Sequence, residues 1–414
     1  MRTRMSAIVW AATVVLLTMA LVLYPEAALE AARDGLKLFF EVVFPSLLPF
    51  FILSEIMLGL GVVHFIGVLF EPLMRPLFNV PGEGAFVLSM GLAAGYPMDA
   101  VITARFRRQD LCTRVEGERM LAFSNTADTL FIFGAVAVGM FGLPALGRTM
   151  AVAHYIGALL VGLTFRFYGP GAAARRPERT ARVGNILGRA VDDLIAARKE
   201  DARPFGKLMG DAVGDSVRTL WLICGFIMLF ATIVRIIDVV HIYSLIAAPF
   251  ELLFRVAHID GSLVRATVAG LFEIDLGSVA AAKATTAGLV QQAAVAGAII
   301  AWSGLSVHGQ VASVLSGTDI RMGPYILARL LHAVLAFAAT VLLMRTGHPA
   351  GEGLWQVLPV LGGLPQGFAH PAFWDVVMRS LTWSLVIPAG LVVVGGTTAA
   401  VSGGLKWVGF HHQR

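Results

Sequence analysis

The sequence predicts an all-α polytopic membrane protein built from two inverted repeats whose helices are broken or re-entrant. Of the 414 residues, 57% are hydrophobic and 14% are charged, which leaves too little polar surface to cover a soluble body of this size. The hexamer Phe70–Arg75 is echoed by Phe250–Arg255, and the pair Gly91-Leu92 recurs at nearly the same offset as Gly270-Leu271. Duplicated units with interrupted helices are a common build for transporters.

Residues 1–35 are expected to form an N-terminal transmembrane helix and a short outer loop. The apolar run Ser6–Leu23 is uncharged and longer than the apolar core of a usual signal peptide. Its flank, Tyr24-Pro25-Glu26, offers no convincing cleavage site with small residues. We therefore predict a first span that is retained.

The first repeat is predicted over residues 36–167. Its apolar stretches are Leu38–Leu60, Val62–Leu77, Ala85–Ala104, Met120–Met140 and Met150–Phe165. A helix needs about 20 apolar residues to span the hydrocarbon core. Because several stretches are shorter than this or contain Pro or paired Gly, they are interpreted as half-helices or re-entrant segments.

A basic linker, residues 168–218, separates the repeats, and its many arginines place it in the cytoplasm by the positive-inside rule. Its stretch Ile186–Leu208 has helical apolar spacing. Two interpretations stay open for this stretch, an amphipathic helix on the membrane and a solvated helical linker.

The second repeat is predicted over residues 219–345. Its apolar stretches are Leu220–Ile237, Ile242–Val256, Leu263–Ala282, Ala287–Val314 and Tyr325–Met344. Residues 346–414 are expected to form an outer loop, a last transmembrane helix at Val376–Val394 and a basic cytoplasmic tail.

The basic loops also predict the orientation of the chain. Arg2 and Arg4 place the N-terminus in the cytoplasm, and the loop between Arg345 and Arg379, which is nearly free of positive charge, lies outside. Each repeat then crosses the membrane an odd number of times, so the repeats are inverted. Cysteines introduced in the linker and at Gly351–Gly353 are expected to label from opposite sides.

Composition and motifs argue against several other classes of protein. Cys112 and Cys224 form no CxxC pair and no disulfide framework, and no metal site is predicted. The net charge of +5 is explained by arginines in loops beside apolar spans, so no nucleic acid partner is expected. No Walker loop, HExxH, Ser-His-Asp order or dinucleotide fingerprint is present, so we expect neither an enzyme nor a cofactor. Energy would come from an ion gradient or from the solute gradient.

The first candidate site is the interrupted run Gly91–Asp99, which holds two glycines and a proline. A helix must break here, and the freed backbone groups are costly in lipid unless protein, water or solute satisfies them. We therefore predict that Gly91, Gly95 and Tyr96 contact a solute. The alternative is a kinked helix packed through its small residues.

The counterpart in the second repeat is the run Gly270–Ser278, which places two acids in an apolar stretch, where ionised groups are costly. Glu273 is the strongest single candidate, for solute binding and for ion or proton coupling, and Asp275 is a second coupling candidate. In the alternative interpretation both acids lie at the membrane edge and pair with Lys283. The predicted solute contacts here are Phe272, Glu273, Gly277 and Ser278.

The third candidate is the polar cluster Ser124, Asn125 and Thr126, which precedes an apolar helix. Its hydroxyls, its amide and the N–H groups at the start of that helix would suit a carboxylate or phosphate. These residues are also ordinary helix N-caps, and the two interpretations are compatible. The equivalent segment of the second repeat supplies Ser303, Gly304, Ser306 and His308.

His308 is either a proton carrier or a hydrogen-bonded packing residue. Because each polar cluster follows its own interrupted helix in the repeat, we predict that the Ser124–Thr126 and Ser303–Ser306 clusters converge on one central cavity.

Several motifs together resemble those of a known family. They are Phe44–Phe51, Phe70–Phe78, Gly91–Pro97, Phe123–Thr126 and Gly270–Ile274. In combination they resemble the sporulation stage V integral membrane proteins, which carry a nucleoside-recognition or gate domain, and the resemblance extends from Leu36 to about Met344. The repeats would then be gate-type repeats whose broken helices line a central site, as in concentrative nucleoside transporters and the membrane part of ferrous-iron transporters.

The resemblance implies export of dipicolinate, pyridine-2,6-dicarboxylate, from the mother cell across the outer forespore membrane, and through it spore heat resistance. The chain would lie in the cell membrane or in that forespore membrane. Met98-Asp99 and Ala127-Asp128 depart from the small, uncharged residues expected there.

Two other functions stay open, a nucleoside or metal-ion transporter of the same architecture and a non-transporting sporulation membrane scaffold. Glu273 and Asp275 favour a cationic or proton-coupled solute, whereas helix N-termini and Ser/Thr clusters favour an anion. The expected partners are a small solute and the lipid bilayer. A homo-oligomer or contacts with other sporulation membrane proteins are also compatible with the sequence.

Overall fold

The structure is a computed structural model that describes residues 2–129, 131–169 and 186–345. The predicted outer loop, last span and tail lie outside these residues. Within the described part of the chain every regular element is helical. Four helical stretches are long and apolar enough to cross a membrane, and six if each sharply bent helix pair is one span. The all-α polytopic fold predicted from composition is confirmed.

The chain begins with a bent helix pair, α1 (Arg2–Leu23) and α2 (Pro25–Leu38). The bend between them is 102° and falls at Tyr24, because Pro25 has no N–H to continue a helix and is well suited to start one. The apolar side chains of α1 are largely exposed, as expected for a helix that faces lipid.

The first repeat continues through a π-helical turn into a series of short helices. They are η1 (Phe39–Val43), α3 (Phe44–Gly59), α4 (Val62–Phe78), α5 (Gly84–Ala94), α6 (Met98–Arg108), α7 (Arg114–Ser124), η2 (Phe131–Met140) and α8 (Pro144–Phe165). The chain turns by 85° between α3 and α4 at Gly61, whose φ of 79° is a left-handed conformation that favours glycine.

The linker helix and the second repeat follow. They are α9 (Ile186–Asp201), α10 (Phe205–Val239), α11 (Tyr243–Val256), α12 (Leu263–Phe272), α13 (Ile274–Lys283), α14 (Leu289–Trp302), α15 (Gly304–Val314) and α16 (Met322–Arg345). Helix α10 starts well before residue 219, where the second repeat was expected to begin. The reason is that Leu208, Ala212 and Ser216 continue one buried face at i+4 spacing.

The two halves have the same order of elements. Each half begins with a long span (α2-η1-α3 or α10), followed by an amphipathic helix that carries the duplicated hexamer (α4 or α11). Next come a re-entrant hairpin (α5–α6 or α12–α13) and a broken span (α7-η2 or α14-α15), and a closing span completes the half (α8 or α16). The shared order of elements is that of two copies of one unit, and an odd number of crossings in each half stays a prediction.

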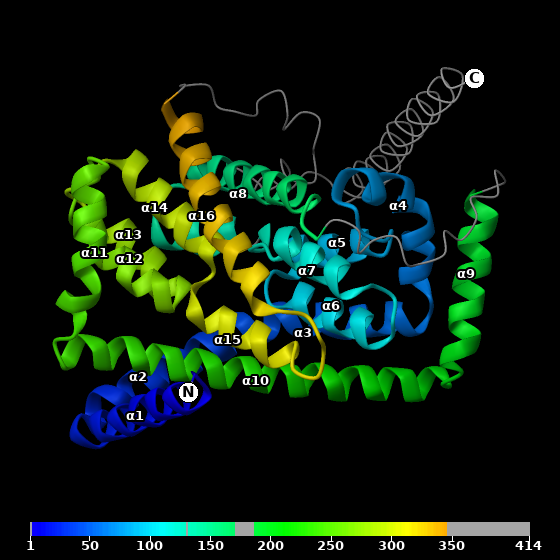
Figure 1. Ribbon diagram of the computed structural model, residues 1–414, viewed down its shortest axis with the longest axis horizontal. Helices are drawn as coiled ribbons and strands as arrows, with labels where there is room; N and C mark the ends of the chain where they lie inside the picture. The colour runs from blue at the N-terminus through cyan, green and yellow to red at the C-terminus, as the bar shows by residue number, and fades with distance from the viewer. Residues whose placement is uncertain (1, 130, 170–185, 346–414) are drawn as a thin grey trace, which may run out of the picture.

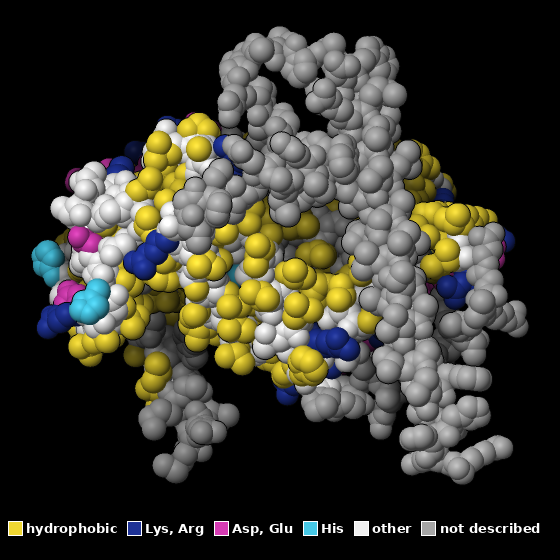
Figure 2. All heavy atoms as spheres, turned by 90° about the horizontal axis from the view of Figure 1, so that it is seen from above, with side chains coloured by type: hydrophobic (Ala, Val, Ile, Leu, Met, Phe, Trp, Pro, Cys, Tyr) yellow, Lys and Arg dark blue, Asp and Glu magenta, His cyan; other side chains and the backbone are white. Residues whose placement is uncertain are grey.

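The equivalent helices start at opposite ends of the molecule. Figure 1 shows α4 and α9 at one end of the long axis, the α9 end, and α11 at the other, the α11 end. Figure 2 shows an apolar surface over the middle and acidic, basic and His side chains at the α11 end. This arrangement is the one expected of inverted repeats, and we expect the long axis to follow the membrane normal.

The linker helix α9 packs along α4 and does not stand free in solvent, since Ala190 is fully buried. A second stripe, Leu187, Val191 and Ile195, stays exposed. An apolar stripe on a helix at this end of the molecule favours the interpretation of α9 as a helix on the membrane surface.

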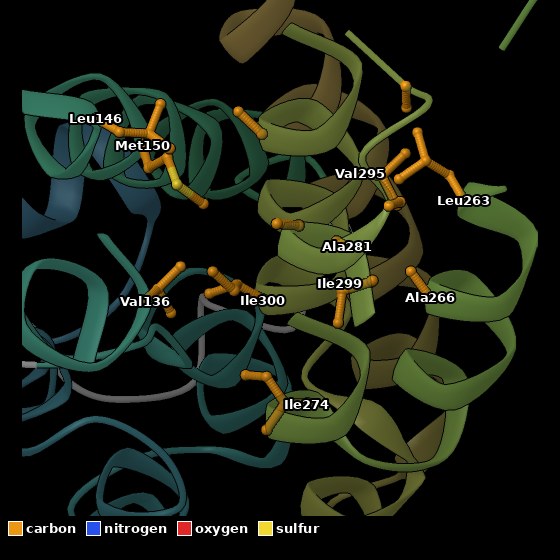
Figure 3. Packing of buried hydrophobic residues seen from close by; sticks show 14 of the residues in the cluster. Val136, Leu146, Met150, Leu263, Ala266, Ile274, Ala281, Val295, Ile299 and Ile300 are labelled. Atoms are coloured by element: carbon orange, nitrogen blue, oxygen red, sulfur yellow. The ribbon is translucent and has the colours of Figure 1, made fainter. Parts of the chain in front are cut away.

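One hydrophobic core joins the two repeats. In Figure 3, Val136 of η2 and Met150 of α8 face Ile299 and Ile300 of α14, with Ile274 of α13 nearby. Because both repeats contribute to this core, about a third of it coming from the first and the rest from the second, the apolar faces of the two repeats are buried against each other.

The hairpin α12–α13 depends on a close approach of two glycines. A Cβ atom built on Gly277 would overlap the Cα atom of Gly270. We expect Gly277→Ala to destabilise the protein by about 1–3 kcal/mol, because backbone would have to move apart in a packed hairpin. Gly225→Ala in α10, where a Cβ meets nothing within 4 Å, is the matched control. Equal thermal unfolding temperatures of the two purified variants would contradict this packing.

The inverted arrangement predicts sidedness at described positions. Lys199 is exposed on α9, and Thr286 is exposed in the loop after α13, where its hydroxyl donates to Asp260 in the loop that follows α11; α9 and α11 lie at opposite ends of the molecule in Figure 1. Single cysteines at these positions are expected to react with a membrane-impermeant maleimide from opposite sides in oriented vesicles. Labelling of both from the same side would rule out a membrane normal along the long axis.

Candidate functional site

In the first repeat, the break of the hairpin α5–α6 lies against the break of the broken span α7-η2. A Cβ atom on Gly91 would overlap the carbonyl oxygen of Ser124. Gly95 has a φ of 71°, and a Cβ there would lie 3.0 Å from the backbone nitrogen of Asp128. The glycines in this run are therefore needed because two backbones touch where both are irregular.

The second repeat contains the equivalent crossing. Gly304 has a φ of 68°, and a Cβ there would lie 3.0 Å from the carbonyl oxygen of Phe272. The indole Nε1 of Trp302 donates to the carbonyl oxygen of Leu271 at 3.1 Å. Glu273 caps α13, since its side chain accepts from the backbone N–H of Leu276 at 2.9 Å. Backbone groups freed by these breaks are thus satisfied inside the protein, as the membrane requires.

The two crossings meet at Tyr325 of α16. Its hydroxyl donates to Oδ1 of Asn125 at 3.1 Å and lies within hydrogen-bonding reach of the Ser303 side chain. Tyr96 packs against the core that contains Ile274 and also against the core that contains Tyr325. Asn125 of the first cluster and Ser303 of the second therefore meet at Tyr325, and the central cavity expected between the clusters stays a prediction.

The Ser124–Thr126 cluster lies between the C-terminal end of α7 and the next helical segment, which resumes at Thr129, so it precedes an apolar helix as expected. Its backbone offers carbonyl oxygens, which carry partial negative charge. The residue that caps the next helix is Asp128, whose Oδ1 accepts from the N–H of Phe131 at 2.8 Å.

A buried arginine from the second repeat satisfies these carbonyl groups. The guanidinium of Arg329 in α16 donates to the carbonyl oxygens of Ala122 and Asn125, and one of its nitrogens lies 3.0 Å from Nδ1 of His332. Arg329 is wholly inaccessible to solvent. A planar, forked donor on one repeat thus clamps the broken span of the other.

The negative charge nearest to this clamp is that of Asp99, which is also fully buried. Its two oxygens accept from the amide of Asn125 at 2.9 Å and from the hydroxyl of Ser124 at 3.2 Å. Asn125 therefore links Asp99 to the segment held by Arg329. The two opposite charges stabilise each other through hydrogen-bonded groups, which a buried charge needs.

Two histidines meet where the closing spans cross. His154 of α8 and His332 of α16 occupy equivalent places in the two repeats, and their ring centroids are 4.5 Å apart. Nε2 of His154 accepts from the N–H of Ala127 at 3.1 Å, and Nε2 of His332 lies 2.8 Å from the carbonyl oxygen of His154. The pair ties both closing spans to the first break.

Several buried polar atoms around the crossings have no hydrogen-bond partner in the described part of the chain. Among the predicted site residues these are the hydroxyls of Tyr96 and Ser278 and Nε2 of His308. His308 lies between the rings of Trp302 and Tyr325, with centroids 4.3 Å and 5.1 Å away. Buried polar groups are almost always satisfied, so each of these atoms is a candidate contact for a bound solute.

The role of His308 follows from its other nitrogen. Nδ1 lies 2.8 Å from the carbonyl oxygen of Gly304, which only accepts, so Nδ1 carries the proton. In the neutral ring Nε2 is then a free acceptor. His308 is thus both hydrogen-bonded within its helix and available to a donor.

Acidic side chains gather on the other side of Tyr96. Asp275 is within hydrogen-bonding reach of Glu273, and the carboxylates of Asp275, Asp128 and Glu273 all act electrostatically on the Tyr96 hydroxyl. Glu273 is only 4% exposed, whereas Lys283 is exposed at the far end of α13. This arrangement favours the interior interpretation of Glu273 over a pair at the membrane edge.

Some predicted residues do not join the centre through their side chains. Phe272 contributes its carbonyl group, while its ring lines a small hollow of about 30 Å³ between α10, α11 and α12. Ser306 accepts a long hydrogen bond of 3.4 Å from Gln310 within α15. Thr126 donates to the carbonyl oxygen of Ser124 and packs near Gly91.

The polar face of α16 was not predicted from the sequence. Tyr325, Arg329 and His332 follow one another at intervals of four and three residues, which places them on one side of the helix. An arginine in an apolar span is itself a functional signal, because its charge is costly there. Within the described residues no group of three His, Cys, Asp or Glu side chains is placed to hold a metal ion.

Comparison with known proteins gives the family. Residues 40–174 match the family described as Gate: Nucleoside recognition. The chain is 42% identical over 365 residues to the sporulation integral membrane protein YlbJ of Bacillus subtilis (strain 168), covering 88% of this chain and 89% of that protein. No solved structure matches. Similarity of this extent shows common membership, and the chain belongs to the family of the sporulation integral membrane protein YlbJ, with a nucleoside-recognition Gate domain in its first half.

Proposed function

We propose that this protein is a transporter that moves dipicolinate from the mother cell across the outer forespore membrane during spore formation. The observation that carries the proposal is the pair of crossed helix breaks, together with buried side-chain atoms on Tyr96, Ser278 and His308, in or beside the interrupted segments, that have no hydrogen-bond partner among the described residues. Interrupted helices from two inverted repeats form the solute site of many transporters. The family membership supports a role in sporulation.

The chemistry of the centre is compatible with a planar aromatic solute that carries carboxylates. Trp302, Tyr325 and Tyr96 offer aromatic faces, and the hydroxyls of Tyr96 and Ser278 offer hydrogen-bond donors. Arg329 is the positive charge buried near these groups. Both terminal nitrogens of its guanidinium already donate to carbonyl oxygens, so it would attract an anionic solute through its charge and not through free hydrogen-bond donors.

A second candidate function is transport of a nucleoside or a cation. The observation in its favour is the group of acids around Tyr96, namely Asp128, Glu273 and Asp275. A dianion beside these carboxylates would need an accompanying cation or proton, because like charges repel strongly at low dielectric. Both groups of residues have a role if Ser278 and His308 bind the solute while Glu273 and Asp275 bind the accompanying proton or cation.

The test is direct transport by the purified protein. Labelled dipicolinate, uridine and ferrous iron are offered separately to vesicles that contain the protein, with and without a proton gradient. We expect saturable uptake of dipicolinate above empty vesicles and little uptake of the other two. Uptake of uridine or iron instead would support the second function, and uptake of none would favour the scaffold.

A further inference from the structure

The two ends of the molecule are closed by different chemistry. At the α9 end, the loop between α6 and α7 of the first repeat meets the loop between α15 and α16 of the second. At the α11 end, the equivalent loops are those between η2 and α8 and between α13 and α14. Each pair of loops connects the two repeats and includes the loop that joins a re-entrant hairpin to the following broken span. Each pair is therefore a candidate gate if the protein transports a solute.

Charged groups hold the α9 end. Nε of Arg107, at the end of α6, donates to Oδ1 of Asp319 at 2.7 Å, and another of its nitrogens donates to Asp110 at 2.7 Å. The neighbouring Arg108 donates to the carbonyl oxygens of Val314 and Ser316 at 2.7 Å and 3.0 Å. The hydrogen bond from Arg107 lowers the pKa of the Asp319 carboxyl, so this acid stays ionised.

A second pair lies next to the first and joins a buried acid to an exposed arginine. Nε of Arg321 in the second repeat donates to Oε1 of Glu118 in α7 at 2.8 Å, and its backbone N–H also faces this oxygen at 3.2 Å. Tyr168 donates its hydroxyl to the same carboxylate at 2.9 Å. The Glu118 side chain is fully inaccessible to solvent, so its partners matter more than those of an exposed acid.

The equivalent loops at the α11 end carry no charge. Their sequences are Phe141-Gly142-Leu143 and Ala284–Gly288. Phe141 packs against the apolar core that includes Ala284 and Ala287. Non-directional apolar contacts tolerate small displacements better than paired hydrogen-bonded charges do.

We propose that the pairs Arg107–Asp319 and Arg321–Glu118 form an ionic latch between the repeats that holds the α5–α6 hairpin closed at the α9 end. The centre opens at this end only when the latch breaks, whereas the η2–α8 and α13–α14 loops, which carry no charged side chain, can move apart without breaking an ion pair between them. The interpretation of the latch as a gate rests on the proposed function. The ion pairs themselves are present in the protein without solute.

The accessibility of Cys112 to a thiol reagent can be used to detect opening of the latch. Cys112 lies in the loop after α6, is 2% exposed, and its carbonyl oxygen accepts from Arg107 at 3.3 Å. In a Cys224→Ala background it is the one cysteine in the chain. The rate at which a water-soluble maleimide modifies Cys112 in purified, solute-free protein therefore measures opening of this loop.

We expect Asp319→Arg to speed this modification at least about fivefold, the effect of losing an ion pair of this exposure, with added repulsion from Arg107 and Arg114. The charge swap Arg107→Asp with Asp319→Arg should bring the rate back to within about twofold of the parent, because the pair is restored in reverse. The matched control is Asp238→Arg, which breaks the exposed pair with Arg265 inside the second repeat and should leave the rate unchanged.

Three results would overturn the latch. They are an unchanged rate in Asp319→Arg, no recovery in the charge swap, and an equal increase in Asp238→Arg. Because no solute is present, these outcomes are independent of dipicolinate transport. A latch that passes this test in a protein that moves no dipicolinate would refute the proposed function alone.

Discussion

Replacement of Arg329 by methionine is expected to remove about 3–5 kcal/mol of stability, enough to leave little folded protein. The change leaves the carbonyl oxygens of Ala122 and Asn125 without their donor and leaves the Asp99 charge buried without its electrostatic partner. The thermal unfolding midpoint of the protein in detergent, followed by size-exclusion chromatography after heating, measures the loss. Arg265→Met, at an exposed arginine, is the control.

The conservative variant separates charge from geometry. Arg329→Lys keeps the positive charge near Asp99 but replaces the planar fork by a single ammonium group, so it should lie between the parent and Arg329→Met. The double variant Asp99→Asn with Arg329→Met should recover part of the loss, because it removes the uncompensated charge. An unfolding midpoint for Arg329→Met equal to that of the Arg265→Met control would show that the clamp contributes nothing.

Glu273→Gln is expected to leave the protein folded and inserted while reducing dipicolinate transport by about tenfold, equivalent to about 1.4 kcal/mol. The amide oxygen can still accept the hydrogen bond from Leu276 that caps α13. The amide nitrogen, however, can only donate toward Asp275, and position 273 can no longer take up or release a proton. The initial rate of uptake into vesicles measures the effect.

The control is Glu251→Gln on α11, an exposed acid of the duplicated hexamer, which should transport at the parent rate. In a spore-forming host, the Glu273→Gln strain should form spores that are poor in dipicolinate and sensitive to heat, with normal amounts of the membrane protein. Wild-type dipicolinate content in that strain would mean that Glu273 is needed only as a helix cap, and the coupling role would be withdrawn.

The architecture follows from local features of the sequence. Apolar stretches give the spans, the duplicated hexamer reveals two copies, and paired glycines mark where helices break, because each of these signals acts over one or two helical turns. The same features predicted that Gly95 and Glu273 lie at breaks, whereas the break of the second broken span at Ser303 was not predicted. Boundaries were less accurate, as at α10, where a buried face extends into the predicted linker.

What the sequence determined by itself is therefore the membrane setting, the repeat and the positions of the breaks. Only the tertiary structure decided which charges meet. Arg329 comes from the last described helix and contacts carbonyl groups of α7, more than 200 residues earlier, and Arg107 reaches Asp319 over 212 residues. Such contacts arise because inversion brings the closing span of one repeat against the broken span of the other. No local pattern encodes that pairing, since a buried polar side chain is selected by its partner in space and not by its neighbours in the chain.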